Sequence, residues 1–202
     1  MYELQFDGLF RRVGENTKTG VMAYGWLISQ DGEIVARGYG AVAGWAEATS
    51  NVAEYLALIE GLTALADMGV RREPVQVIGD SKIAISQMRG RAAIHAERMK
   101  ELNLRARQLA AHFHKIEYTW CKRSQNKAAD MLTRHALKQA RRNQPHYNSV
   151  LKQLITSRGM RLRKNRSLLD SFMPLVELSV FRPHKNAAEI YDRFAYESML
   201  SL

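Results

Sequence analysis

The chain has 202 residues, of which 46% are hydrophobic, and a formal net charge of +10. This length suits one domain of ordinary size with a small appendage, and the composition can bury a sizeable core. A single cysteine, Cys121, excludes an internal disulfide and favours a reducing compartment. No apolar run approaches the ~20 residues of a membrane span, and the first ten residues lack the pattern of a signal peptide. We therefore expect a cytoplasmic protein with no membrane partner.

The predicted elements begin with three strands, at residues 2–10, 21–29 and 33–41, and an Asp-Gly turn signal joins the second strand to the third. The apolar spacing then predicts a helix over 50–70, which Gly69 stops. The elements that follow are a strand at 74–79, helices at 81–89 and 95–112, a strand at 115–122 and a helix at 126–142. This order predicts an α/β fold with a mixed five-stranded sheet, three antiparallel strands followed by two parallel ones, flanked by helices.

The positive charge is concentrated near the C-terminal end of this order. Residues 131–169 contain no Asp or Glu and ten basic residues, which are Arg134, Lys138, Arg141, Arg142, Lys152, Arg158, Arg161, Arg163, Lys164 and Arg166. The other 20 basic residues balance the 20 acidic ones. A basic segment on a neutral body predicts a polyanionic partner, chiefly nucleic acid. The alternative is a solvated tail.

Four carboxylates occupy unusual places. Asp7 lies in the first strand, off the apolar face, and Asp80 stands where a strand runs into a helix. Glu54 shares a helical stripe with Leu58, so its side chain should point towards the sheet, and Asp130 lies inside the last helix. Each acid alone has a structural alternative, such as a turn acceptor, a salt bridge, a helix cap at Asp80 or a helix-dipole partner. Four acids on four elements of one mixed sheet favour a shared metal site instead.

Four segments resemble the signature segments of type 1 ribonuclease H, in order and element type: FDG (6–8), SNVAEY (50–55), GDS (79–81) and NKAAD (126–130). The resemblance covers about residues 1–140. It implies an endonuclease that hydrolyses the RNA strand of RNA/DNA hybrids by a two-metal-ion mechanism, leaving 5′-phosphate and 3′-hydroxyl ends. Two Mg²⁺ ions, for which Mn²⁺ can substitute, would be held by Asp7, Glu54, Asp80 and Asp130.

The resemblance also implies other site residues. Arg123 takes the place of a histidine that many bacterial members carry, and it can bind phosphate but cannot act as a base. Its alternative is an exposed loop arginine that never meets phosphate. The family recognises the 2′-hydroxyls of RNA through backbone groups and small polar side chains. The expected substrate contacts are Gly8, Ser50, Asn51, Ser81, Lys82 and Asn126.

We expect a catalytic domain at residues 1–142 and a basic, helical extension at 143–202 that lies outside the resemblance. Its last part, 187–202, reads as an amphipathic helix. The extension is expected to dock on the catalytic domain or on a protein partner; the alternative is a linker with a partner-binding helix. Two other functions stay open. One is a nuclease of the same fold that acts on double-stranded RNA or another nucleic acid. The other is a non-catalytic nucleic-acid-binding or assembly subunit, against which four mutually repelling carboxylates argue.

Overall fold

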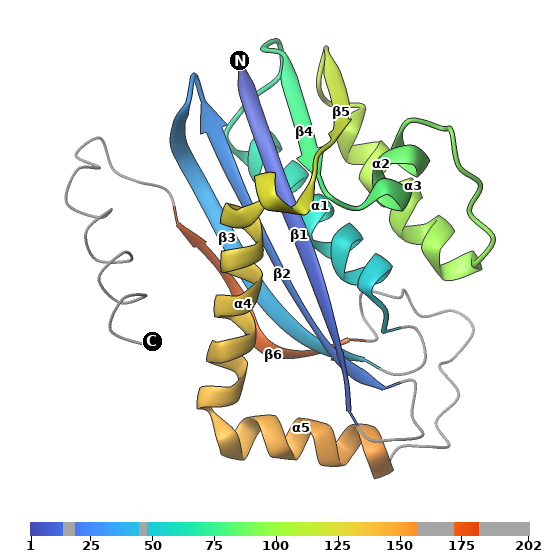
Figure 1. Cartoon of the computed structure of the whole chain (residues 1–202), viewed down its shortest axis with the longest axis vertical. Coiled ribbons are helices and arrows are strands. Elements are labelled where there is room, and N and C mark those ends of the chain that lie inside the picture. The colour runs from blue at the N-terminus through green and yellow to red at the C-terminus, as the bar shows by residue number, and fades with distance from the viewer. Residues whose placement is uncertain (14–18, 45–47, 157–171, 182–202) are drawn as a thin grey trace.

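A computed structural model describes residues 1–13, 19–44, 48–156 and 172–181, which build a mixed sheet with helices on both faces (Figure 1). The strands are β1 (Tyr2–Arg12), β2 (Gly20–Gln30), β3 (Glu33–Gly44), β4 (Val75–Gly79), β5 (Ile116–Trp120) and β6 (Met173–Phe181). The helices are α1 (Ser50–Asp67), α2 (Lys82–Met88), α3 (Glu97–Ala110), α4 (Lys127–Arg142) and α5 (Gln144–Thr156), with a 3₁₀ turn, η1, at Arg123–Gln125. None of the helices in these ranges is both long and apolar enough to cross a membrane.

The sheet has the strand order β5-β4-β1-β2-β3-β6. Strands β1, β2 and β3 pair antiparallel, while β4 pairs parallel with β1 and β5 pairs parallel with β4. The Asp-Gly turn signal between β2 and β3 is confirmed, because Asp31 and Gly32 both have positive φ, at 53° and 92°, as a tight two-residue turn requires. The predicted α/β mixed sheet is therefore confirmed.

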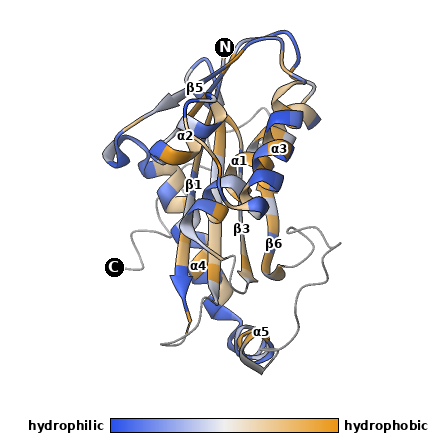
Figure 2. Ribbon diagram, turned by 90° about the vertical axis from the view of Figure 1, so that its right-hand side faces the viewer, coloured by the Kyte–Doolittle hydropathy of each residue, from blue (hydrophilic) through white to orange (hydrophobic). Residues whose placement is uncertain are grey.

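Side chains of β2 alternate between two apolar layers. Met22 and Tyr24 face the layer that contains α1, α2 and α3, whereas Val21 and Ala23 face α4 and α5. Because both faces are covered, nearly every residue of β2 is buried. Figure 2 shows the apolar residues gathered on the strands between the helices and hydrophilic residues on the outer side of α3.

Helix α1 packs closely on the sheet and ends as its sequence predicts. A Cβ at Gly61 would lie 2.5 Å from Cδ1 of Leu4, so the glycine permits the close approach of helix and sheet. At the C-terminal end, Gly69 has φ 79° and its N–H donates to the Ala66 carbonyl, which closes the helix.

The prediction of a helical C-terminal extension is only partly correct. Helix α5 forms, but residues 173–181 form strand β6, which pairs antiparallel with β3 and brings the sheet to six strands. Without β6, the long strand β3 would end the sheet with a row of unpaired main-chain groups. Val150, Leu154 and Leu175 are buried in the same layer as α4, so α5 packs on that face of the sheet and β6 contributes a side chain to the same layer. The predicted terminal helix at 187–202 lies outside the described residues.

Candidate metal site

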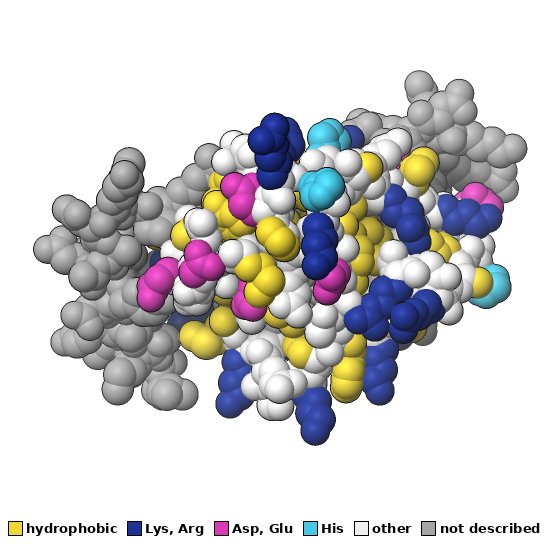
Figure 3. All heavy atoms as spheres, turned by 90° about the horizontal axis from the view of Figure 1, so that it is seen from above, with side chains coloured by type: hydrophobic (Ala, Val, Ile, Leu, Met, Phe, Trp, Pro, Cys, Tyr) yellow, Lys and Arg dark blue, Asp and Glu magenta, His cyan; other side chains and the backbone are white. Residues whose placement is uncertain are grey.

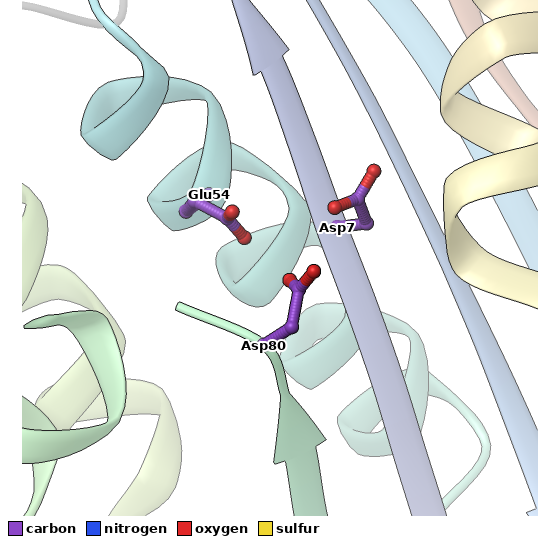
Figure 4. A group of neighbouring side chains, drawn as sticks. All are labelled: Asp7, Glu54 and Asp80. Atoms are coloured by element: carbon purple, nitrogen blue, oxygen red, sulfur yellow. The ribbon is translucent and has the colours of Figure 1, made fainter. Parts of the chain in front are cut away.

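Three of the four predicted acids meet at one point of the sheet. Asp7 projects from the middle of β1, Glu54 from α1 and Asp80 from the residue after β4, and their carboxylates point towards one another (Figure 4). One oxygen from each lies within 4.8 Å of the others. The sheet produces this convergence because β4 stops at Gly79, which pairs with Phe6, while β1 continues to Arg12. The side chains just past that end share the space that a longer β4 would have filled.

Two carboxylates in this trio, those of Asp7 and Glu54, are poorly compensated. Asp7 is 3% exposed and Glu54 is 8% exposed, and one oxygen of each is buried without a hydrogen-bond partner. Burial, together with the Asp80 charge, raises the pKa of Asp7 to about 6. Burial, followed by the Asp7 and Asp80 charges, raises the pKa of Glu54 well above its ordinary value. Buried carboxylate oxygens that lack donors and repel one another are the hard ligands that a divalent cation prefers, so the residues fit a metal site.

Close backbone packing fixes Asp7 and Glu54 in place. A Cβ at Gly8 would lie 2.2 Å from the backbone N of Glu54, so only glycine allows β1 and α1 to meet here. On the other face, a Cβ at Gly25 would lie 2.7 Å from Cβ of Leu132, which shows how closely α4 crosses β2. This approach lets the buried Thr133 hydroxyl donate to the main-chain carbonyl of Asp7 at 3.1 Å.

Asp80 is positioned by its neighbours and does not cap α2. The Trp120 indole N–H donates to the Asp80 carbonyl at 3.0 Å. The cap of α2 is Ser81, whose hydroxyl accepts from the N–H of Ala84 at 3.3 Å. The alternative of a capping aspartate is therefore wrong, and the Asp80 carboxylate stays with Asp7 and Glu54.

The fourth acid, Asp130, lies apart from the trio and is held by two arginines. Nη2 of Arg123 lies 2.8 Å from one carboxylate oxygen, and Nε of Arg134 lies 2.6 Å from the other. Burial alone would raise the pKa of Asp130, but the hydrogen bonds from Arg134 and Arg123 outweigh it and lower the pKa. Asp130 is still near enough for its charge to raise the pKa of Asp7.

The comparisons with known proteins agree with this geometry. A family described as reverse transcriptase-like matches residues 6–136, which include the trio and Asp130. A curated relative, "Ribonuclease HI" of Halobacterium salinarum, is 36% identical over 136 residues, covering 67% of this chain and 63% of that protein. The chain belongs to the ribonuclease H-like family.

Solved ribonuclease H structures share the fold. The N-terminal RNase H domain of Rv2228c from Mycobacterium tuberculosis is 28% identical, with a TM-score of 0.58, over 75% of this chain and 96% of that one. RNase H1 from Halobacterium salinarum is 33% identical, with a TM-score of 0.58, over 68% of this chain and 97% of that one. The matched part of this chain spans less than two thirds of the curated relatives.

Five of the six expected substrate contacts surround the ribonuclease H-like site. Gly8, Asn51 and Ser81 are half-buried, while Ser50 and Lys82 are exposed. The Lys82 ammonium lies 4.5 Å from the centre of the Trp120 ring. Small polar groups and a cation therefore border the trio at the N-terminal ends of α1 and α2.

The sixth expected contact, Asn126, is placed differently. It is fully buried, and its amide donates to the Phe6 carbonyl at 2.8 Å. This bond ties the start of α4 to β1 beside Asp7.

The sequence analysis gave no role at the site to two supporting residues, Thr133 and Arg134. They lie three and four residues after Asp130, which is the spacing of neighbours on one helical face, so the sequence did hold a signal for them.

Proposed function

We propose that the chain is a metal-dependent endonuclease that hydrolyses the RNA strand of RNA/DNA hybrids. The observation that carries this proposal is the meeting of Asp7, Glu54 and Asp80 within 4.8 Å, where Asp7 and Glu54 each have one buried carboxylate oxygen without a donor. The family and the relatives named ribonuclease H support the same substrate class. The repulsion between these carboxylates costs folding free energy, and a non-catalytic binding subunit would gain nothing from it.

The four predicted acids would together hold two Mg²⁺ ions, for which Mn²⁺ can substitute. Asp7 would help to hold both ions, because it is near enough to feel the charges of both Asp80 and Asp130. Glu54 and Asp80 would hold one ion and Asp130 the other. The chemistry supplied by such a pair is an activated attacking water and a stabilised 3′ leaving oxygen, which gives 5′-phosphate and 3′-hydroxyl products. Asp130 must first give up at least one of its bonds to Arg123 and Arg134.

The remaining residues orient the substrate. Arg123, released from Asp130, is exposed and can donate two N–H groups to a phosphate. Ser50, Asn51 and Ser81 offer small polar groups of the kind that read 2′-hydroxyls, and Gly8 offers its main chain. Asn126 is assigned a structural role, because its bond to the Phe6 carbonyl holds the start of α4 against β1.

Cleavage of matched duplexes tests the proposal. RNA/DNA, RNA/RNA and DNA/DNA duplexes of one sequence are incubated with the wild type, with Asp80→Asn and with the control Glu117→Gln, which changes an exposed acid on β5. The expected result is cleavage of the RNA strand of the hybrid with Mg²⁺ or Mn²⁺, its loss in Asp80→Asn and its retention in the control.

Two results would contradict the proposal in different ways. Equal cleavage of RNA/RNA would favour the alternative nuclease, which acts on double-stranded RNA. Near wild-type cleavage by Asp80→Asn would overturn the metal assignment. A Mg²⁺-dependent rise in the melting temperature of the wild type, absent in Asp80→Asn, gives a second measure of ion binding that does not depend on catalysis.

A further inference from the structure

A basic groove opens on the surface beside the acidic site. It has a volume of about 450 Å³ and lies between the end of β1 and the outer half of α4. Its apolar floor includes Leu9 and Leu137. Its cations are Arg11, Arg134, Lys138 and Arg141.

Most of this charge is uncompensated. Arg134 is engaged with Asp130. Among the described residues, Arg11, Lys138 and Arg141 have no carboxylate within ion-pair distance. Seen from the end of the sheet at which β1 starts, Lys and Arg side chains line the edge that faces the viewer in Figure 1 (Figure 3). Three cations around one cavity, without an ion-pair partner in the described part of the chain, fit a ligand that carries several negative charges.

Two rows of residues lead from the acids into the groove. Asp7 and Arg11 are four residues apart on β1, so both side chains lie on one face of the strand, about 13 Å apart along it. On α4, Asp130, Lys138 and Arg141 recur at helical spacing over about 16 Å. The groove therefore continues the line of the acidic site over roughly four nucleotides of a strand, at about 3.4 Å each.

We propose that this groove binds the sugar-phosphate backbone of the nucleic-acid strand next to the point of cleavage. The inference rests on the proposed function, since it assumes that a phosphate occupies the acidic site. Lys138, Arg141 and Arg11 neutralise successive phosphates, while the apolar floor contacts sugars. An acidic peptide would meet the charges but has no reason to continue into a metal site, so we favour nucleic acid.

The test measures binding at several salt concentrations. The full-length Asp80→Asn protein, which should not cleave, is compared with the same protein carrying Lys138→Gln and Arg141→Gln. A matched control carries Arg72→Gln and Lys115→Gln, which remove two charges near the opposite end of the sheet, where β4 and β5 begin. The groove variant should bind an RNA/DNA hybrid roughly tenfold more weakly at physiological salt, with a log–log slope flatter by about 1.4–1.8. The control should keep its slope.

Folding of the variants needs a separate check. Arg141 is half-buried, whereas Lys138 is exposed, so Lys138→Glu alone provides a second variant that changes only an exposed side chain. A melting curve for each protein confirms that it is folded before binding is compared.

The outcomes separate the groove from the proposed function. An unchanged slope in a folded groove variant, while the parent still binds the hybrid, overturns the groove and leaves the function intact. Poly-glutamate serves as a model of an acidic peptide. A groove variant that loses poly-glutamate binding but keeps the salt slope for the RNA/DNA hybrid also overturns the proposal, because the groove then serves a protein. If the Asp80→Asn parent binds only double-stranded RNA, the proposed function is refuted. The same salt titration with double-stranded RNA then shows whether the groove binds its backbone. A parent that binds no nucleic acid overturns both.

Discussion

Replacing Asp7 by Asn should stabilise the metal-free protein at neutral pH. Burial and the Asp80 charge raise the pKa of Asp7 from its ordinary value of 3.8 to about 6. Between these values the folded chain holds a proton that the unfolded chain has lost, so stability falls as the pH rises through this window. At about 1.4 kcal/mol for each pKa unit, the charged carboxylate costs about 3 kcal/mol at pH 7. The amide has no charge and avoids this cost.

Thermal unfolding in a chelating buffer measures the effect. For a chain of this length, about 3 kcal/mol corresponds to a rise in Tm of about 6–12 °C, since each kcal/mol gives about 2–4 °C. This value is an upper limit, because the amide is itself a buried polar group. Near pH 4 the two proteins should unfold at similar temperatures. Added Mg²⁺ should raise the Tm of the wild type more than that of Asp7→Asn.

Glu117→Gln provides the control, since Glu117 is exposed on β5 and its replacement should leave Tm nearly unchanged. An Asp7→Asn protein that is less stable than the wild type at pH 7 would refute the reasoning. A gain of equal size at pH 4 and pH 7 would also refute it, because the benefit would then not come from removal of a charge.

Substitutions at three further residues probe other parts of the structure. Arg123→Ala should slow single-turnover cleavage by on the order of tenfold or more. Arg123→Lys should restore the rate only in part, because lysine lacks the planar two-point geometry for phosphate. Wild-type kinetics in the alanine variant would show that Arg123 has no role in cleavage. Gly8→Ala places a methyl group 2.2 Å from the backbone N of Glu54. It should therefore lower the free energy of unfolding by about 1–3 kcal/mol and reduce cleavage. A normal Tm with normal activity would contradict the close packing of α1 on β1. Leu154→Ala should lower the free energy of unfolding by about 2–5 kcal/mol in urea while folded protein still cleaves, and an unchanged midpoint would show that α5 is not anchored in the core.

The sequence was sufficient for features that depend on local pattern. The position of Glu54 on an inward stripe of its helix predicted that its side chain would be buried, and it is. Asp7 was placed off the apolar face of its strand, yet it is buried too, because α4 packs on that side and Thr133 bonds to its main chain. The order of strands and helices then determined that Asp80 would lie beside them, because few sheet topologies fit such an order.

The features that could not be predicted depend on distant partners. Strand β6 forms because β3, more than 120 residues earlier, offers a free edge, and no local pattern reports such pairing. Asp80 and Ser81 are both good caps at adjacent positions, and the extended backbone of Ser81, with φ −78° and ψ 98°, decides between them. Arg134 was counted only as part of a basic segment, although its spacing from Asp130 matches a helical ion pair.

The pairing of β6 with β3 also bears on solubility. Strand β3 has 12 residues and lies next to a hairpin partner that is almost wholly buried, so its outer edge would be a long, flat template for strands of other molecules. Strand β6 covers most of this edge with the chain's own backbone. It is shorter than β3, and it carries Pro174 near its start and an exposed Glu177 in its middle, which disfavour further strand addition. Strand β6 therefore protects the edge of β3 from pairing with strands of other molecules, which would lead to aggregation.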